Sequence, residues 1–140
     1  MSRGWTKCLP IAVWPSADRA AWERAIRPGN PFADGGVAAR WSAATQRKTS
    51  VGYGRFLFWL KGRNELNEAA GPAERITRDH LKVYLEDLRN VNRGHTIQCR
   101  IQELGDAMRA LAPQCDWSFI NRARRFHRNC RSSDGSEQVW

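Results

Sequence analysis

The sequence predicts an all-α protein, with a four-helix bundle preceded by an N-terminal helical arm. Two observations predict this class. Apolar residues recur at intervals of three and four in five separate segments, which is the period of an amphipathic helix. No stretch of any length alternates apolar and polar residues as a half-buried strand would. A chain of 140 residues can bury a core without disulfides or a metal ion.

The arm is expected to comprise residues 1–34. Within it, the segment 16–26 (SADRAAWERAI) is predicted to be a helix with Ser16 as its N-cap and Trp22 on its apolar edge. The Pro-Gly dipeptide at 28–29 ends this helix, and the NPFADGG stretch that follows is predicted to be a loop.

The second helix is predicted to begin near Ser42 and to extend through the stretch FLFWL. Winding it at about 100° per residue places one set of residues on the same side: Trp41, Thr45, Thr49, Gly52, Phe56, Trp59 and Leu60. Lys48 and Arg55 fall on a flank of this side, and Arg47 falls opposite.

Three residues of this helix raise questions of packing. Phe58 falls on the outer side, where it is expected to be exposed unless the arm covers it. Gly52 and Gly54 each cost about 1 kcal/mol in a helix interior, so close packing against another segment is expected there.

Three further helices complete the predicted bundle, which spans residues 35–130. The third is the stretch ITRDHLKVYLEDLRN, with Thr77 as N-cap and Ile76 packed against Leu81. The fourth, HTIQCRIQELGDAMRALAP, stops at its proline, and the fifth, DWSFINRARRFHRNC, is capped by Asp116. Residues 131–140 are expected to form a disordered tail.

The charges are numerous and segregated. Lys and Arg number 23 against 14 Asp and Glu, for a net charge of +9. Three windows contain no acid, namely residues 35–64, 88–102 and 117–133, whereas acids gather in and before the third helix. Segregation of this kind suits a phosphate-binding face. Ordinary charged helix surfaces remain the alternative.

The fourth helix carries small polar groups opposite its apolar stripe: His95, Gln98, Cys99 and Gln102. Its first turn presents free backbone N–H groups, which suit a phosphate, and amide and imidazole groups suit base edges. A plain polar solvent face is an equal alternative from this helix alone.

The cysteines give no sign of a metal site or a disulfide framework. The four of them show no C-x-x-C spacing, so reduced thiols are expected. Cys115, His127 and Cys130 lack a fourth ligand at a suitable spacing for zinc. No apolar run approaches the ~20 residues of a spanning helix, and no secretory signal is recognised, so a cytoplasmic protein away from membranes is expected.

The order of three stretches is similar to that in a known family. The stretches are T…GRFLFWL, ITRDHLKVYLEDLR and HTIQCRIQELGDAMRALAP…DW. Their succession resembles the N-terminal core-binding domain of tyrosine recombinases of the phage-integrase type, a SAM-like helical module that precedes the catalytic domain. The resemblance covers residues 14–128. It implies one half of a C-shaped clamp, in which the second and fourth helices cross duplex DNA near adjacent major grooves. It also implies a bacterial or phage-derived, nucleoid-associated protein.

Carried over by position, the resemblance implies DNA contacts from the second and fourth helices, and the acid-free windows add Arg55 and Arg93. Cys99 is a poor base reader and a Lys would be stronger than His95, so phosphate anchoring is expected rather than sequence readout. The expected DNA-binding residues are Thr45, Arg47, Lys48, Arg55, Arg93, His95, Thr96, Cys99 and Arg100.

No catalysis is expected from this chain. The resemblance implies chemistry by a Tyr nucleophile, an Arg, a Lys and an H-x-x-R motif on the following domain. H-x-x-R does not occur here, because the third residues after the three histidines are Val83, Gln98 and Cys130. Both tyrosines are expected in the core. The expected partner is double-stranded DNA, without a cofactor, with sister protomers or a catalytic-domain partner beside it on DNA.

Two other functions are kept as alternatives. A helical protein-interaction module would use the basic faces, an exposed Phe58 and the tryptophans of the arm, Trp5, Trp14 and Trp22. A helix-turn-helix regulator fits less well, because the connection between the third and fourth helices is longer than that motif's turn of about 3–4 residues.

Overall fold

The computed structural model describes residues 7–91 and 94–134, and the side chains of all of these except residues 91, 95 and 127–134. The all-α class is confirmed, because no strand occurs in this part of the chain. The elements are the 3-10 helices η2 (Ile11–Val13) and η3 (Pro72–Glu74) and the helices α1 (Ser16–Ile26), α2 (Ala43–Gly62), α3 (Arg78–Val91), α4 (Gly94–Leu111) and α5 (Ser118–Asp134).

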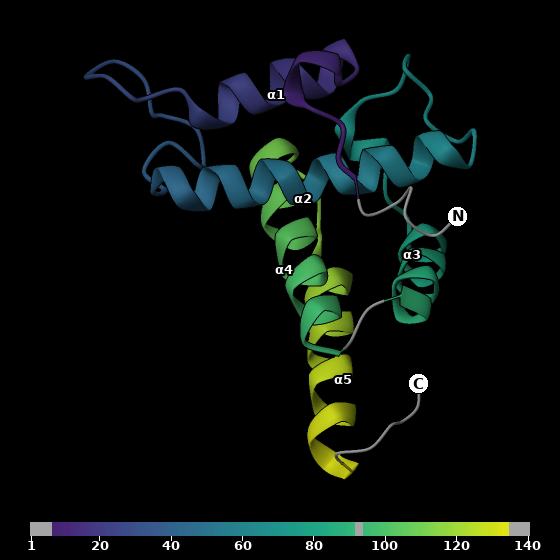
Figure 1. Ribbon diagram of the computed structural model, residues 1–140. Coiled ribbons are helices and arrows are strands. Elements are labelled where there is room, and N and C mark those ends of the chain that lie inside the picture. The colour runs from purple at the N-terminus through teal and green to yellow at the C-terminus, as the bar shows by residue number, and fades with distance from the viewer. Residues whose placement is uncertain (1–6, 92–93, 135–140) are drawn as a thin grey trace.

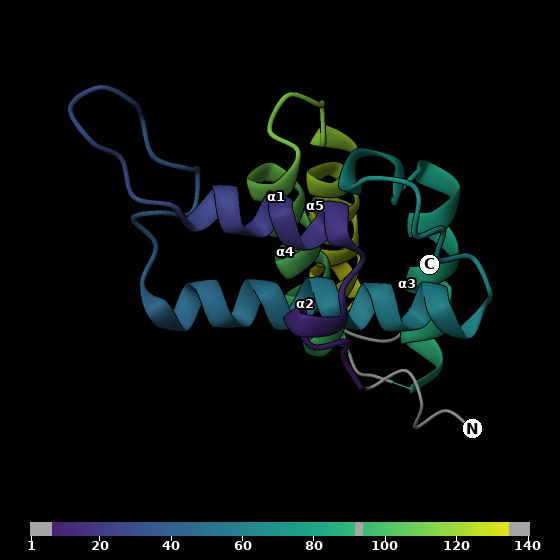
Figure 2. The ribbon, with the colours of Figure 1, turned by 90° about the horizontal axis from the view of Figure 1, so that it is seen from above.

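Helix α4 is the centre of the molecule and contacts α1, α2, α3 and α5. The long helix α2 crosses α4 at a steep angle, and α1 runs beside α2 in both views (Figures 1 and 2). Helix α5 packs along α4, and α3 stands apart from α5 beneath the C-terminal half of α2 (Figure 1).

Local signals set the starts of the helices. Thr77 Oγ1 accepts a hydrogen bond from the His80 N–H at 3.1 Å, which confirms the predicted cap of α3. Ser42 Oγ accepts one from the Thr45 N–H at 3.1 Å, so the residue near which the second helix was predicted to begin is its N-cap. The predicted cap Ser16 is wrong: α1 begins at Ser16, and Pro15 occupies the cap position without a side-chain bond. The Pro15 carbonyl instead accepts the Asp18 N–H, at 3.0 Å.

Gly52 and Gly54 are both sites of close packing, as their positions inside a helix predicted. A Cβ atom on Gly52 would lie 2.4 Å from Cβ of Glu103, so α4 crosses α2 at this glycine. A Cβ atom on Gly54 would lie 2.5 Å from the Leu9 carbonyl oxygen, and the Leu9 N–H donates to the Gly54 carbonyl at 3.0 Å. The N-terminal segment therefore runs directly along the other side of α2.

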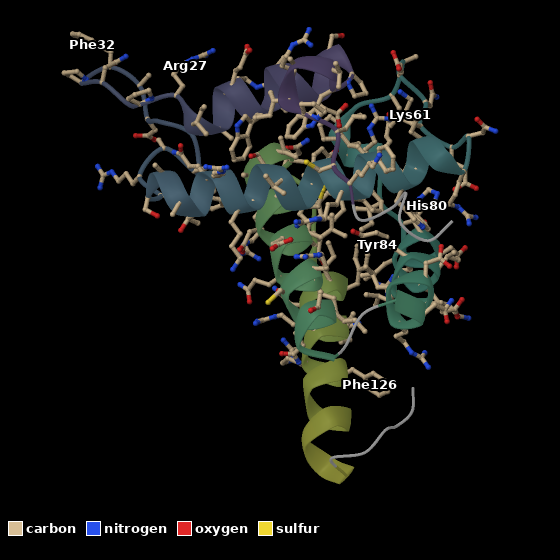
Figure 3. All side chains as sticks on the ribbon, viewed as in Figure 1. Arg27, Phe32, Lys61, His80, Tyr84 and Phe126 are labelled. Atoms are coloured by element: carbon tan, nitrogen blue, oxygen red, sulfur yellow. The ribbon has the colours of Figure 1, made fainter. Side chains whose placement is uncertain are left out.

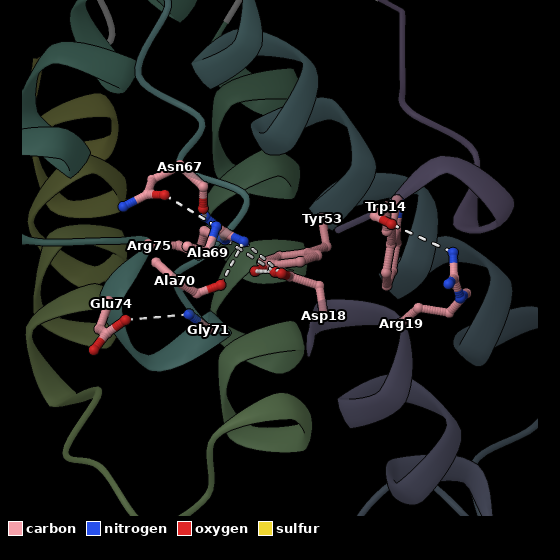
Figure 4. A network of polar contacts seen from close by, with 10 residues as sticks. All are labelled: Trp14, Asp18, Arg19, Tyr53, Asn67, Ala69, Ala70, Gly71, Glu74 and Arg75. Carbon is pink, nitrogen blue, oxygen red and sulfur yellow. Dashed lines mark hydrogen bonds and ion pairs between the residues drawn. The ribbon is translucent and has the colours of Figure 1, made fainter. Parts of the chain in front are cut away.

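A buried polar network joins α1 to the rest of the bundle (Figure 4). The Asp18 carboxylate, which is fully buried, accepts from Arg75 Nη2 at 2.6 Å and Nε at 3.1 Å, and from the Tyr53 hydroxyl at 2.5 Å. Arg75 also donates to the carbonyls of Asn67 and Ala70. Helix α1, which lies in the arm expected at residues 1–34, is thus joined to the core of the bundle.

The two tryptophans of the arm that the structure describes are buried. Trp14 and Trp22 are 2% and 4% exposed and belong to the core, and Phe58, for which the sequence left exposure or cover by the arm open, is partly buried against it. The alternative of a protein-interaction module therefore cannot use Trp14 or Trp22 as exposed contacts. Trp5 lies outside the described residues.

Helix α5 extends to Asp134, four residues into the segment expected to be a disordered tail. The remaining six residues of that segment lie outside the described part of the chain.

Candidate nucleic-acid interface

A cleft of about 300 Å³ opens where α2, α4 and α5 meet, beside the crossing of the first two helices. Its lining residues are polar or charged types apart from one cysteine, and they carry charges of both signs. The lining residues are Thr45, Lys48, Thr49, Gln98, Cys99, Gln102, Glu103, Asp106 and Arg124.

Helix α2 supplies the first wall through residues spaced three and four apart, which share one side of a helix. Thr49 is buried and fixes this side against the bundle, whereas Thr45 and Lys48 are exposed at its edge. The Thr45 hydroxyl accepts a hydrogen bond from Ser42 Oγ at 3.0 Å, which ties it to the capped start of the helix.

Glu103 forms the floor of the cleft, directly over Gly52. Its side chain is 5% exposed and binds two arginines: Arg100 Nη1 lies 3.1 Å from both carboxylate oxygens, and Arg55 Nη1 lies 3.5 Å from one. Burial raises the pKa of the Glu103 carboxyl, and the two guanidinium groups oppose that rise. The three side chains together leave one net positive charge.

Helix α5 closes the cleft with Arg124. Its Nη1 donates to Gln102 Oε1 at 2.9 Å. The neighbouring amide of Gln98 has a buried Nε2 with no hydrogen-bond acceptor among the described residues. A buried N–H without an acceptor costs free energy, so Gln98 is an unsatisfied polar group in this wall of the cleft.

The structure brings together some of the residues predicted from the sequence and separates others. Thr45, Lys48 and Cys99 line the cleft, and Arg55 and Arg100 lie at its floor on Glu103. Thr96 is half-buried in α4, three residues before Cys99. Arg93 lies outside the described residues, and His95 lies in α4 with a side chain outside them.

Arg47 is exposed but belongs to another side of α2. It stands two residues from Thr45 and two from Thr49, which is about 160° around the helix from each. Arg47 and Lys48, expected to act together, therefore project in different directions.

Arg124, Glu103 and Asp106 were not among the predicted site residues. The acid-free window 117–133 indicated that α5 is basic, but helical periodicity alone does not say which of its arginines faces α4. Glu103 marked only the end of a window in the sequence, yet it lies inside the basic face. Asp106 is paired with Arg109 one turn further on.

The described residues offer no other recognisable chemical centre. No group of three or more His, Cys, Asp or Glu side chains in this part of the chain is placed to hold a metal ion. Cys8, Cys99 and Cys115 form no disulfide bond with another residue whose side chain is described. No described helix has both the length and the apolar character needed to cross a membrane.

Comparisons with protein-family models, with curated proteins and with solved structures find no match to this chain.

Proposed function

We propose that this chain binds duplex DNA, with the cleft between α2, α4 and α5 turned toward the phosphate backbone. The observation that carries the proposal is the convergence of cations from three helices on one cleft. Lys48, Arg100 and Arg124 come from α2, α4 and α5, and Arg55 adjoins them. Cations held on a rigid bundle release condensed counterions when they meet phosphates, which supplies sequence-independent affinity.

The pairing with Glu103 leaves both arginines able to bind phosphate. A guanidinium carries five N–H donors, and only Nη1 of Arg100 and of Arg55 is bonded to the carboxylate. Glu103 acts as a buried positioning group that fixes both side chains, which are 20% and 23% exposed. Lys48 contributes a mobile point charge at the rim.

The α4 wall of the cleft also carries two uncharged amide groups. The Gln98 amide, whose buried Nε2 has no described acceptor, and the Gln102 amide stand between the cations. The cations bind phosphates and set the register, whereas base edges lie deeper in the duplex than the phosphates that the rim of a cleft would contact. Phosphate anchoring rather than base readout is therefore the role that we propose for this cleft.

We further propose that the chain is a binding module of the core-binding type, without strand-cleaving ability. The two tyrosines support this. Tyr53 is 0% exposed and its hydroxyl donates a hydrogen bond to Asp18, and Tyr84 is 1% exposed. Burial raises the pKa of both hydroxyls, so neither is an accessible or activated nucleophile.

The test is duplex binding followed by fluorescence anisotropy at about 50 and 200 mM salt. The variant Lys48→Glu/Arg124→Glu should lose at least about tenfold in affinity at the lower salt, and its salt slope should fall by about two. The matched control is Arg27→Glu/Lys61→Glu, which makes the same change in net charge at exposed positions away from the cleft (Figure 3).

The control should bind nearly as well as the unmodified protein. Equal losses in both variants would show that only overall charge attracts DNA and would overturn the assignment of the cleft. Absence of salt-dependent binding by the unmodified protein would overturn the function itself. Circular dichroism of each variant confirms that the helices are retained.

A further inference from the structure

A second hollow, of about 550 Å³, lies between α3 and α5, away from the proposed DNA-binding cleft. Its floor is apolar and is formed by Leu81 and Leu85 from α3 and by Phe119, Ala123 and Phe126 from α5. Phe126 is 52% exposed although it belongs to this apolar surface. A hollow of this size and character suits an apolar side chain of a partner.

The rim of this groove is cationic. Arg78 and Lys82 border it from α3 and Arg122 from α5, and Glu86 is an acidic member of the lining. The Arg78 guanidinium lies 5.4 Å from the centre of the Phe119 ring, so it covers one end of the apolar floor. The occupant that fits is therefore an apolar group accompanied by a carboxylate.

The same chain presents such a group at the tip of the loop between α1 and α2. Phe32 is 96% exposed, the most exposed large apolar side chain among the described residues. The tip segment 28–36 (PGNPFADGG) contains Asp34 and no basic residue.

The tip is ordered by its own hydrogen bonds. The Asn30 N–H donates to the Ala33 carbonyl at 2.8 Å, the reverse bond is 3.2 Å, and the Phe32 N–H donates to Asn30 Oδ1 at 2.8 Å. A turn that is already formed loses little conformational entropy when its side chain is buried by a partner.

The tip and the groove of one molecule lie far apart. The loop projects beyond the junction of α1 and α2, whereas the groove lies between α3 and α5 at the other end of the molecule, and Figure 3 shows Phe32 and Phe126 well separated. A loop tip that reaches a groove of this kind must therefore come from a second copy.

We propose that the Phe32 tip of one copy inserts into the α3–α5 groove of a second copy, with Asp34 against the cationic rim. The contact is heterologous, because the two copies use different surfaces, and it repeats from copy to copy unless it closes into a ring. A single aromatic anchor buries about 150–250 Å². Association in free solution is accordingly weak, with a dissociation constant in the micromolar to millimolar range.

The test uses sedimentation velocity without DNA, so that its outcome is independent of the proposed function. The weight-average mass of the unmodified protein should rise above the 16.0 kDa monomer as concentration increases. Phe32→Asp and Phe126→Glu, both changes of exposed side chains, should each remain monomeric at all concentrations. Val13→Asp, at another exposed apolar position, is the matched control and should associate like the unmodified protein.

A mixture of the two disabled variants gives the sharpest result. The Phe32→Asp copy keeps its groove and the Phe126→Glu copy keeps its tip, so an equimolar mixture should form heterodimers and nothing larger. A monomeric unmodified protein, a monomeric mixture, or association that survives Phe32→Asp would each overturn the proposal. Association lost in Phe126→Glu alone would assign the groove to a different occupant and overturn it equally.

Discussion

At the scale of single residues, Glu103 sets the character of the proposed DNA-binding surface. It occupies the space left by Gly52, holds Arg55 and Arg100 in place, and also subtracts one charge from the face. Its carboxyl has a raised pKa because it is buried. A group whose pKa rises on folding stabilises the folded state most below its ordinary pKa, and this contribution is lost as pH rises through the raised value.

Glu103→Gln should therefore bind duplex DNA several-fold more tightly, because it adds a positive charge to the face while keeping an oxygen that accepts from Arg100. The free energy of unfolding of the unmodified protein, relative to that of the variant, should decline as pH rises from acid to neutral. Anisotropy measures the first effect, and urea unfolding at several pH values measures the second. Weaker binding by the variant would contradict this role for Glu103.

The two tyrosines allow a second prediction about single residues, because both hydroxyls are buried. The pKa of Tyr53 is raised well above 10.0 by burial and by the Asp18 carboxylate, and burial likewise raises that of Tyr84. Both hydroxyls bind protons more tightly in the folded state, so the free energy of unfolding should fall as pH rises above about 10. Ultraviolet absorbance should show no tyrosinate in that range until the protein unfolds. Early titration of one tyrosine would contradict its burial.

At the scale of elements, the Asp18–Arg75 pair decides whether α1 belongs to the bundle. Asp18→Ala leaves a buried guanidinium without its partner, and it should lower the free energy of unfolding by about 3–5 kcal/mol. The control Glu23→Ala removes an exposed carboxylate of the same helix and should change it little. Urea unfolding followed by circular dichroism measures both. A small effect of Asp18→Ala would mean that α1 is attached by other contacts.

The sequence predicted each of the five helices but not how α1 is attached. Ser42 and Thr77 each bond a residue within the first turn of their helix, so the sequence alone indicates where these helices begin. Asp18 and Arg75 are separated by 57 positions, and each alone is typical of a solvent face. Gly52 predicted a close approach without naming the partner. Which helices meet depends on long-range packing that periodicity does not encode.

At the scale of the whole molecule, the cleft at α2, α4 and α5 and the groove between α3 and α5 are separate surfaces. A molecule that binds DNA by one and a neighbour by the other should occupy adjacent sites cooperatively. Phe32→Asp should abolish cooperative occupancy of a long duplex and leave affinity for a single-site duplex unchanged, as measured by electrophoretic mobility shift. Cooperativity retained by the variant would separate DNA binding from the contact between copies.

The sequence predicted which helices carry the basic face, but not which side chains line the cleft. Acid-free windows located it on three helices, because counting charges needs no knowledge of packing. The selection of Arg124 and the inclusion of Glu103 follow from how α2 and α5 are rotated against α4, whereas helical winding alone already placed Arg47 opposite the packed side of α2. Phe32, inside a short polar loop, gave no periodic signal, so its exposure became visible only in three dimensions.

The distance along the chain between Asp18 and Arg75 also governs how the protein is made. A ribosome delivers Asp18 57 residues before its partner, so the first helix leaves the exit tunnel well ahead of the guanidinium that neutralises it. A nascent chain released before that point carries a carboxylate that cannot be buried and an apolar helix face without a cover. Because α1 also packs against α4, the N-terminal third can join the fold only after synthesis has passed both Arg75 and α4.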